Sequence, residues 1–517
     1  ELWKTDGTAA GTVEVKDIHP TGGSNPQDFV LHGGKVYFSA DDNSVFGREL
    51  WVTDGTTAGT VLVHDFAPGL DDGLSFNNNN LTSHNGDLYL TAGISPFDKE
   101  LWKTDGTFAG TSLVKDIEGG GGSSNPDWLT PISPTLLMFT ADTDALGEEL
   151  YVTDGTAPGT TLLVEIEDAV ITDDSNPNNM HPVGGDFVLF VADDGVTGEE
   201  LYRWDAATGA TLLKDINPGA DDSDAYAFYT CFLGGQLVTF FRADDGTNGA
   251  ELWITDGTAA GTSMLADIHP GGGASSPIEF FFHPLHQALY FQADDGVTGA
   301  ELWRTDGTTA GTTLVADINV GASGSFPAGI IDNGLAMVFR ANDGANGIEL
   351  FASYGTGPST TLVMDIFPGT DPFFGPNSSN PKDFFHIGGK LVFVAGNDVV
   401  GQELWTTDGT AAGTSVVVDL WPGDDGAGYS HMTWFQDEVY FQGNNGVSGY
   451  ELYKTDGTAA GTFEIFDGSA SGLGFLAGEG FAVIGDLAYF LAWTPGGIEL
   501  WSTDLTPAGT APVGLVT

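Results

Sequence analysis

The chain has 517 residues, of which 72 are acidic and 15 are basic, giving a formal net charge of −57. Such a charge repels nucleic acids and anionic membrane surfaces and attracts cations and basic partners, so it excludes nucleic-acid binding as a function class. Hydrophobic residues make up 41% of the chain, with 34 Phe and 12 Trp. This content is ample for a packed core and argues against global disorder.

The predicted elements follow one pattern along the chain, which the period after residue 27 shows well. Short runs of aromatic and β-branched residues predict four strands, at residues 28–31, 35–40, 49–53 and 61–64. Gly33-Gly34 and Asp54-Gly55 separate two pairs of these strands, and such dipeptides are strong hairpin signals. No segment keeps an apolar period of 3.6 residues, so we expect few helices.

One motif organises the chain: Glu-Leu-Trp-x-Thr-Asp-Gly-Thr-x-x-Gly-Thr, with Tyr or Phe replacing Trp in four copies. Its eleven copies are spaced by 48 to 54 residues and begin at Glu1, Glu49, Glu100, Glu149, Glu200, Glu251, Glu301, Glu349, Glu403, Glu451 and Glu499. A fixed period of this length predicts a repeat architecture. Four antiparallel strands per period predict the blades of an all-β β-propeller.

The number of blades follows from counting complete sets of four strands, named A to D. Ten sets are complete, and residues 1–18 form an unpaired C–D hairpin. We therefore predict an orphan hairpin of a preceding or partial blade at 1–18 and a ten-repeat propeller at 19–517. An eleven-bladed ring and two smaller propellers remain alternatives, and only the longer connection at 370–377 favours the split. Because the chain opens inside a repeat, we expect a mature or excised piece without its targeting ends.

The repeated residues are expected to build the ring. In an up-and-down blade the A–B and C–D turns share one face, and the B–C loops and D-to-A connections share the other. The Asp of each Thr-Asp-Gly-Thr turn should accept backbone N–H bonds while the Gly adopts positive φ. The Glu that opens each C strand should bind backbone N–H groups of an adjacent loop, with a metal ligand as the alternative. The aromatic residue two positions later should pack between blades.

Carboxylates gather on the opposite face from these turns, in the B–C loops and at the ends of the D strands. Paired carboxylates and backbone carbonyls are oxygen ligands that suit Ca²⁺. The loops therefore predict calcium as the one candidate cofactor, with solvated or turn-capping acids as the alternative. The candidate ligands are Asp41, Asp42, Asp193, Asp194, Asp244, Asp245, Asp294, Asp295 and Asp343.

Signals for an enzyme are weak in this sequence. It holds no His-Glu-x-x-His, no Gly-x-Ser-x-Gly and no phosphate-binding loop. We predict no catalytic residue and interpret His283 and His286, a pair in one divergent A–B region, as structural. Cys231 is the single cysteine, so an intrachain disulfide is impossible, and no apolar run of about 18 residues predicts a membrane span.

The motif at residues 49–60 resembles that of the bacterial ELWxxDGT-repeat proteins, and the resemblance covers essentially the whole chain. It implies a secreted or cell-surface protein. The expected function is a non-enzymatic propeller for adhesion or binding, or a surface scaffold, with a glycan or a protein surface as ligand. The alternatives are a structural subunit of an extracellular filament or sheath, which binds neighbouring copies, and a secreted glycan-active hydrolase with its centre near Cys231 or Phe280–Phe282.

Overall fold

The structure is a computed structural model, and it describes residues 2–4, 13–19, 23–42, 46–75, 80–95, 97–164, 175–185, 187–334, 336–435, 438–447, 449–466, 474–475, 482–484, 487–494, 497–503 and 511–516. The A–B turns expected at Asp437 and Gly485 and the tip of the first B–C loop, residues 43–45, lie outside the described residues. Strands account for nearly all of the regular structure, and the two helices described are single 3-10 turns, η1 (Gly357–Ser359) and η2 (Ala411–Gly413).

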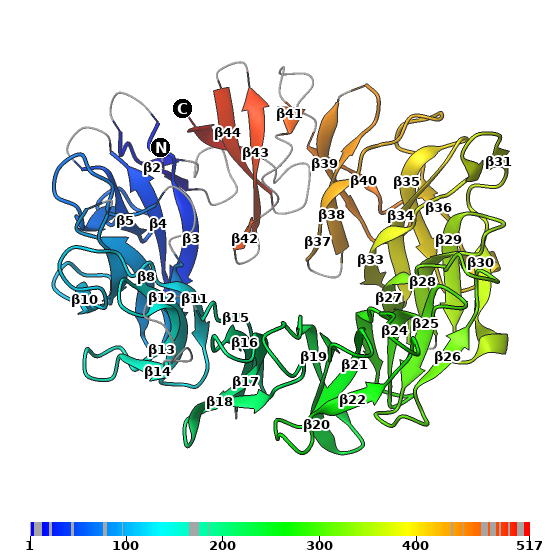
Figure 1. Cartoon of the computed structure of the whole chain (residues 1–517). Coiled ribbons are helices and arrows are strands. Elements are labelled where there is room, and N and C mark those ends of the chain that lie inside the picture. The colour runs from blue at the N-terminus through cyan, green and yellow to red at the C-terminus, as the bar shows by residue number, and fades with distance from the viewer. Residues whose placement is uncertain are drawn as a thin grey trace.

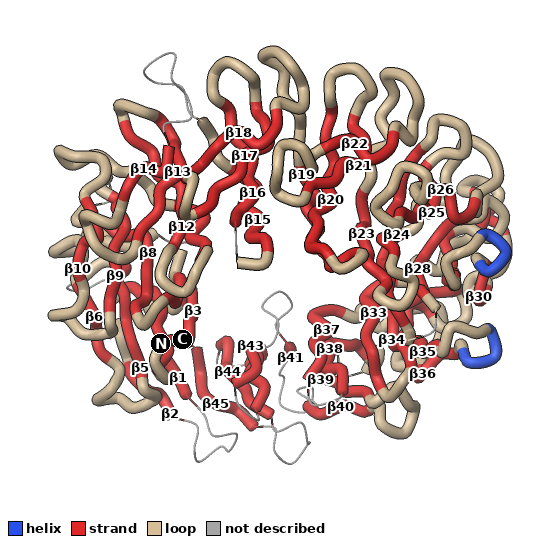
Figure 2. The backbone as a smooth tube through the Cα atoms, turned by 90° about the horizontal axis from the view of Figure 1, so that it is seen from below, coloured by secondary structure: helices blue, strands red, loops and turns tan. Residues whose placement is uncertain are grey.

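The strands form antiparallel sheets arranged around a central opening, as Figures 1 and 2 show. Nine sheets have four strands that pair in chain order, and a tenth has five. We call these sheets blades 1 to 10. The prediction of a β-propeller built from four-stranded blades is confirmed.

The bounds of the strands are as follows. Blade 1 holds β3 (Gln27–His32), β4 (Lys35–Asp41), β5 (Arg48–Thr53) and β6 (Val61–His64); blade 2 holds β7 (Thr82–His84), β8 (Asp87–Gly93), β9 (Lys99–Thr104) and β10 (Ser112–Lys115); blade 3 holds β11 (Asp127–Pro131), β12 (Leu137–Thr143), β13 (Gly147–Thr153) and β14 (Thr161–Val164). Blade 4 holds β15 (Asn178–Val183), β16 (Phe187–Asp193), β17 (Glu199–Asp205) and β18 (Gly209–Lys214); blade 5 holds β19 (Tyr226–Leu233), β20 (Gln236–Asp244), β21 (Ala250–Thr255) and β22 (Ser263–Ala266); blade 6 holds β23 (Ile278–His283), β24 (Ala288–Asp294), β25 (Ala300–Thr305) and β26 (Thr313–Ala316). Blade 7 holds β27 (Ala328–Asp332), β28 (Met337–Asn342), β29 (Ile348–Ser353) and β30 (Thr361–Met364); blade 8 holds β33 (Lys382–Ile387), β34 (Lys390–Asn397), β35 (Gly401–Thr407) and β36 (Ser415–Val418). Blade 9 holds β37 (Ser430–Phe435), β38 (Glu438–Asn444), β39 (Tyr450–Thr455) and β40 (Phe463–Phe466); blade 10 holds β41 (Gly474–Phe475), β42 (Ala482–Ile484), β43 (Leu487–Thr494), β44 (Gly497–Thr503) and β45 (Ala511–Val516).

In blades 1 to 9 the first strand lies at the inner edge and the last at the outer edge (Figure 1). First strands of neighbouring blades contact one another, for example β23 with β27 and β27 with β33. The second strands are buried on both faces, as the unbroken apolar runs predicted: Leu289, Tyr290 and Phe291 are all fully buried.

The aromatic residue of the motif packs between blades, which confirms its predicted role. Trp253 of blade 5 lies in one buried cluster with Val183 and Leu189 of blade 4. Buried clusters of the same kind join each neighbouring pair among blades 1 to 9, so none of these blades could bury its apolar faces alone.

The N-terminal hairpin consists of β1 (Leu2–Lys4) and β2 (Val13–Lys16), which pair with each other. Leu2, Val15 and Ile18 pack against Phe38 and Trp51 of blade 1, and β45 lies beside both strands of the hairpin. The two ends of the chain are accordingly close together in Figures 1 and 2. The division into a hairpin at 1–18 and a propeller at 19–517 stays a prediction.

A short additional hairpin, β31 (Thr370–Asp371) and β32 (Gly375–Pro376), occupies the longer connection between blades 7 and 8. It belongs to the D-to-A connection, and Figure 1 shows the blades on both sides of it continuing one ring, so the alternative of two propellers is not favoured. Within the described part of the chain, no helix is long and apolar enough to span a lipid bilayer.

Candidate functional site

The Glu that opens each C strand is a structural latch. In blade 5 the Glu251 carboxylate accepts hydrogen bonds from the backbone N–H groups of Ile268 and His269, at 2.8 and 3.2 Å, and of Ser275, at 3.1 Å. The Ser275 hydroxyl donates a further bond of 2.6 Å to the same carboxylate. Equivalent bonds are made by Glu49, Glu100, Glu200, Glu301, Glu349 and Glu403. The latch predicted from the sequence is confirmed.

These latch carboxyl groups are buried, and burial raises their pKa values. Desolvation raises the pKa of Glu49 to about 8, although three backbone N–H bonds oppose that shift. It likewise raises the pKa of Glu200 and of Glu403 to about 7. A raised pKa at a buried carboxyl often marks a catalytic acid. Here it recurs around the ring beside backbone amides, so it reflects the construction of the blade.

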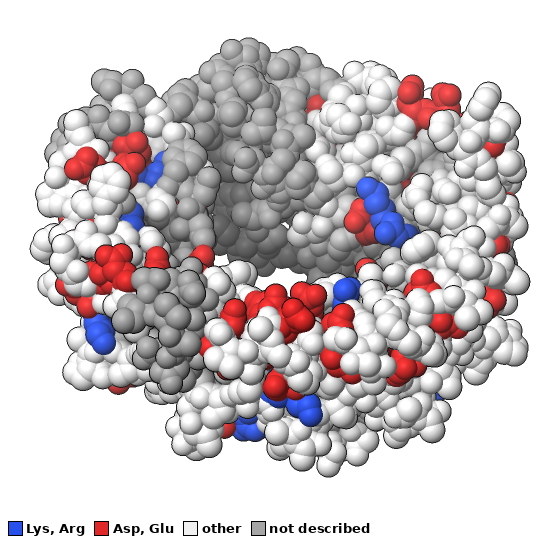
Figure 3. All heavy atoms as spheres, viewed as in Figure 1, with Lys and Arg blue, Asp and Glu red and all other residues white. Residues whose placement is uncertain are grey.

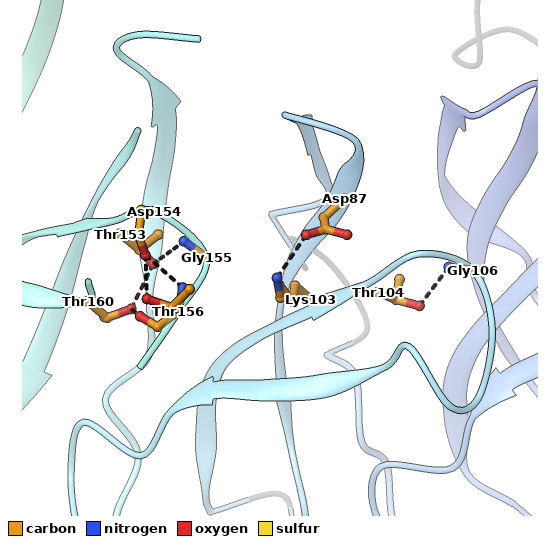
Figure 4. A network of polar contacts seen from close by, with 9 residues as sticks. All are labelled: Asp87, Lys103, Thr104, Gly106, Thr153, Asp154, Gly155, Thr156 and Thr160. Atoms are coloured by element: carbon orange, nitrogen blue, oxygen red, sulfur yellow. Dashed lines mark hydrogen bonds and ion pairs between the residues drawn. The ribbon is translucent and has the colours of Figure 1, made fainter. Parts of the chain in front are cut away.

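The Thr-Asp-Gly-Thr segments form the C–D turns through a network of short polar contacts (Figure 4). In blade 3, Asp154 Oδ1 accepts bonds from the N–H and the hydroxyl of Thr156, at 2.9 and 2.6 Å. The hydroxyls of Thr153 and Thr160 lie 2.7 Å apart and close the base of the turn. The bonds from Thr156 hold the pKa of Asp154 below its ordinary value. The prediction that these residues are structural is confirmed.

The Gly of the same turn contacts the preceding blade. A Cβ atom built on Gly257 of blade 5 would lie 2.3 Å from Cζ of Phe187 of blade 4, and the φ of Gly257 is +83°. Gly457 of blade 9 faces Val392 and Ile387 of blade 8 in the same way. The turn therefore needs glycine both for its backbone conformation and for the close approach of the two blades.

The nine candidate metal ligands lie at the B–C loops, where most of them accept hydrogen bonds from their own turn. Asp295 Oδ1 accepts bonds from the N–H groups of Val297 and Thr298, at 2.9 and 2.6 Å, and Asp294 Oδ1 accepts one from Gly296 at 2.7 Å. The same arrangement holds for Asp193, Asp194, Asp244, Asp245 and Asp343. Asp42 Oδ1 accepts the Phe46 N–H at 2.7 Å, and the Asp41 N–H donates to Ser24 O.

The electrostatics of these loops follow from the turn bonds. Desolvation is the largest single influence on Asp194, Asp245 and Asp295 and acts to raise the pKa. The hydrogen bonds from the turn together outweigh it, so the pKa of each is lowered. The carboxylates are therefore charged and held in fixed positions. Among the described residues no group of three or more His, Cys, Asp or Glu is arranged to hold a metal ion, and calcium binding stays a prediction.

The aspartates at the ends of the D strands differ from the loop acids. One oxygen, Oδ1, is buried without a hydrogen-bond partner in Asp65, Asp215, Asp317, Asp365 and Asp419. Burial raises the pKa of Asp65, Asp365 and Asp419. Each of the five residues is still partly exposed.

The histidine pair singled out in the sequence is packed into the interface between blades 6 and 7. The rings of His283 and His286 stack with their centroids 3.8 Å apart, and His286 Nδ1 lies 2.8 Å from the Tyr290 hydroxyl. His283 is fully buried, and its Nε2 lies 3.9 Å from Asp332 Oδ1. These contacts agree with the structural role predicted for the pair.

Within the described part of the chain, a pocket of about 360 Å³ opens between blades 8 and 9 and offers a candidate site for a ligand. His386, Ile387 and Gly388 line it from the end of β33 and the A–B turn of blade 8. Trp434 of β37 and Asp456 of the C–D turn of blade 9 complete the lining. Trp434 is 53% exposed although it lies on an inner strand. The pocket thus combines an aromatic face, a carboxylate and an imidazole.

The position of Asp456 is set by its turn. Its Oδ1 accepts the N–H and the hydroxyl of Thr458, at 2.8 and 2.7 Å. Among the described residues, none donates to its Oδ2. Gly457 of the same turn lies against Ile387 and Val392 of blade 8, and the two bonds from Thr458 hold the carboxylate in its turn.

Sequence reasoning missed this pocket, because its residues occupy ordinary positions of the repeat. Asp456 is a motif residue interpreted as structural, and Trp434 and His386 stand on two different inner strands. The available signal was an aromatic residue at the penultimate position of an inner strand, where blades 1 and 4 carry Leu31 and Pro182 but blades 5 and 6 also carry an aromatic, Phe232 and Phe282. That signal becomes visible only once the strand register is known.

Comparison with known proteins gives a fold-level likeness. No protein-family model matches the chain, and no curated protein matches it. The likeness to ELWxxDGT-repeat proteins therefore stays a prediction.

Among solved structures, the chain is similar to a puromycin hydrolase, with 16% identity, a TM-score of 0.29, and 76% of this chain and 60% of that chain covered. It is also similar to a prolyl endopeptidase, with 11% identity, a TM-score of 0.30, and 81% of this chain and 54% of that chain covered. A third similar structure is oligopeptidase B from Leishmania major, with 8% identity, a TM-score of 0.34, and 67% of this chain and 49% of that chain covered. The chain spans 49 to 60% of the length of these three proteins, and the likeness describes the arrangement of strands alone.

The expectation of a non-enzymatic adhesion module, scaffold or filament subunit is wrong by this comparison, because the matched structures are hydrolases and peptidases. The physical reason for this error is that residues repeated in every blade carry no information about catalytic residues outside the repeat. The motif builds a ring, and a ring of structural residues is compatible with an enzyme.

Proposed function

We propose that this propeller is the substrate-recognition domain of a peptidase that acts on basic polypeptides. The observation that carries the proposal is the pocket between β33 and β37, where Trp434 and Asp456 line one cavity. In this proposal the pocket takes the side chain of a lysine or an arginine of the substrate.

The chemistry of the pocket favours a cation. An aromatic face attracts ammonium and guanidinium groups through its quadrupole, and a carboxylate adds a charge-assisted hydrogen bond. A volume of about 360 Å³ accommodates one long side chain together with water. Polypeptides are the commonest polymers that carry such cations on flexible stems.

The charge of the whole chain supports the same class of ligand. With a net charge of −57, the protein attracts basic ligands over long distances and repels acidic ones. Figure 3 shows acidic side chains spread over the visible face of the ring, with few basic ones among them. The peptidase part of the proposal takes up the activities of the solved structures reported above and depends on no residue of this chain.

The location belongs to the proposal as well. We place the protein outside the cell, in agreement with the family that the repeated motif resembles. Activity of the culture medium on a basic peptide, compared with that of the cell lysate, tests this placement.

Binding of a fluorescein-labelled peptide tests the recognition step. The probe is Gly-Ser-Lys-Gly-Ser-Lys-Gly-Ser, with Glu replacing both Lys in the control peptide, followed by fluorescence anisotropy. We expect the basic peptide to bind and the acidic peptide not to bind. Trp434→Ala should weaken binding about five- to thirtyfold, because a partly desolvated cation–π contact stabilises by about 1–2 kcal/mol. Asp456→Asn should weaken it at least about tenfold, because a hydrogen bond to a charged group contributes about 1.5–3 kcal/mol.

Matched variants separate the pocket from the fold. Asp408→Asn changes the same turn position in blade 8, and Trp128→Ala removes another exposed tryptophan of an inner strand, so both should bind like the unchanged protein. Equal binding of both peptides, or equal losses in all four variants, would overturn the proposal. Cleavage of the basic peptide by the purified protein, read by mass spectrometry, tests the peptidase part separately.

A further inference from the structure

The face of the ring opposite the pocket carries exposed apolar side chains at the tips of its loops. This face consists of the B–C loops and the D-to-A connections. Along the consecutive blades 6 to 9, the exposed residues are Val297, Val320, Phe373, Phe374, Val399 and Val447, each 70% exposed or more. We call these six residues the apolar arc.

The apolar arc is preformed, because hydrogen bonds within the turns fix the backbone that carries its side chains. The N–H groups of Val297, Val399 and Val447 each donate a bond of 2.9 Å to the side chain two residues earlier, Asp295, Asn397 or Asn445. Each loop thereby presents its valine from a fixed backbone. Side chains held rigidly in this way lose little freedom when a partner covers them.

The hairpin β31–β32 forms the most prominent part of the arc. Phe373 and Phe374 at its tip are 88 and 90% exposed. Asp371 Oδ1 accepts the N–H groups of both, at 2.7 and 3.0 Å, and Asn377 N–H donates to Gly369 O at 3.1 Å to close the base. The other D-to-A connections carry no such hairpin among the described residues. Two adjacent phenylalanines on an ordered tip are typical of anchor residues that enter a partner's pocket.

The connection below the hairpin is fixed as well. The Ser379 N–H and hydroxyl both bind the latch residue Glu349, at 2.8 and 2.5 Å, and the Gly396 N–H donates to Ser379 O at 2.9 Å. The hairpin is thereby tied to strands of blades 7 and 8. Its position relative to Val399 of the neighbouring loop is part of the rigid ring.

Charge decides which partner fits the arc. Asp295, Asp371 and Asp398 stand in the same loops as the apolar tips, and no Lys or Arg does. A second copy of this chain, also at −57, would be repelled, and so would an anionic lipid surface. A protein surface with apolar pockets bordered by Lys and Arg complements both features.

We infer that the apolar arc is a docking surface for a protein partner with a basic, apolar-pocketed face, and that Phe373 and Phe374 are its anchors. This inference is independent of the proposed peptide recognition, because the arc and the pocket lie on opposite faces. A failure of peptide binding in Trp434→Ala leaves docking unchanged.

Site-specific photocrosslinking tests the inference in a whole culture of the cells that produce the protein, with its medium. Phe373 is replaced by p-benzoylphenylalanine, and Leu285, which is 78% exposed on the A–B turn of blade 6, is replaced likewise as the control. We expect position 373 to crosslink to one protein with a basic surface and position 285 not to do so. The crosslinked protein is identified by mass spectrometry and purified for the binding step.

The binding step then measures the affinity of the purified partner. Phe373→Ser combined with Phe374→Ser should weaken it at least about tenfold, while Leu285→Ser leaves it unchanged. Raising the NaCl concentration from 50 to 500 mM should weaken it further, about tenfold, as charge complementarity requires. An unchanged Tm of the double variant shows that the ring remains folded.

Three results would overturn the inference. They are crosslinking of Phe373 to a second copy of the chain, binding of the purified protein to phosphatidylcholine vesicles that the double Ser variant loses, and the absence of any crosslink specific to position 373. The first would make the arc a self-association surface, and the second would make it a lipid-binding surface.

Discussion

The Ser275 hydroxyl and the Glu251 carboxylate lie 2.6 Å apart and join the D-to-A connection of blade 5 to the start of its C strand. The Asp294 N–H of blade 6 in turn donates to Ser275 O at 3.0 Å. One connection is therefore held by two neighbouring blades. The same geometry recurs at Ser325 and Ser379, so the latch links successive blades around the ring.

Replacing a latch residue should destabilise the ring. In Glu251→Gln the amide keeps one acceptor oxygen, but its NH₂ group faces backbone N–H donors that lose their partner. Leaving a buried donor unsatisfied costs about 1–3 kcal/mol. We expect a Tm lower by several degrees, measured by calorimetry. Glu279→Gln serves as the control, because this glutamate of blade 6 accepts a single, exposed bond from the Gly329 N–H. Equal Tm values for the two variants would refute the latch.

Stability should fall as the pH rises from about 5 to about 8.5. The latch carboxyls have folded pKa values above the ordinary 4.5, about 8 for Glu49 and about 7 for Glu200 and Glu403. A group with a raised folded pKa contributes stability that is complete below 4.5 and is lost as the pH passes the folded pKa. Calorimetry over this range should show a steadily decreasing Tm.

General repulsion among the acidic residues acts in the same direction, so a control is needed. Salt screens repulsion between surface charges but leaves buried carboxyls largely unaffected. In 0.5 M NaCl the decline in Tm should persist in the unchanged protein and become shallower in Glu49→Gln. A decline that salt removes entirely would assign the effect to the surface charges instead.

Replacing the glycine of a C–D turn should lower the free energy of unfolding by more than its positive φ alone explains. Gly257 and Gly235 have φ of +83° and +87°, so Ala strains the backbone equally at both. A Cβ at Gly257 would also lie 2.3 Å from Phe187, whereas none of the heavy atoms around Gly235 comes within 4 Å of one. We expect Gly257→Ala to destabilise by about 1–3 kcal/mol more than Gly235→Ala, as measured by urea unfolding. Equal losses would show that the turn does not press on the neighbouring blade.

The fold could be predicted because the same pattern of strands and turns recurs along the chain. Strand spacing and apolar runs agree from copy to copy, and Asp-Gly turns recur in most of them. The latch and turn roles of Glu251 and Asp154 followed from chemistry at fixed positions. The pocket could not be predicted in this way. Trp434, His386 and Asp456 come from two blades and meet only through inter-blade packing, and a periodic pattern marks the residues that copies share rather than those in which they differ. For Phe373, the sequence showed only that the connection that contains it is longer than the others, and did not show that its side chain is exposed.

Calcium binding at the B–C loops remains to be tested, and one loop position allows a clean variant. Asp295 Oδ1 accepts the N–H groups of Val297 and Thr298. Asn in its place keeps that acceptor and the turn, but removes the charge that a cation requires. If the loops bind calcium, 5 mM CaCl₂ should raise the Tm above that in EDTA, because a ligand at a hundredfold excess over Kd stabilises by about 2.7 kcal/mol. Asp295→Asn should reduce that rise, and Asp306→Asn, at a C–D turn on the other face, should not. Identical Tm values in calcium and EDTA would leave the loop carboxylates as caps of their own turns, which is the role that their hydrogen bonds already show.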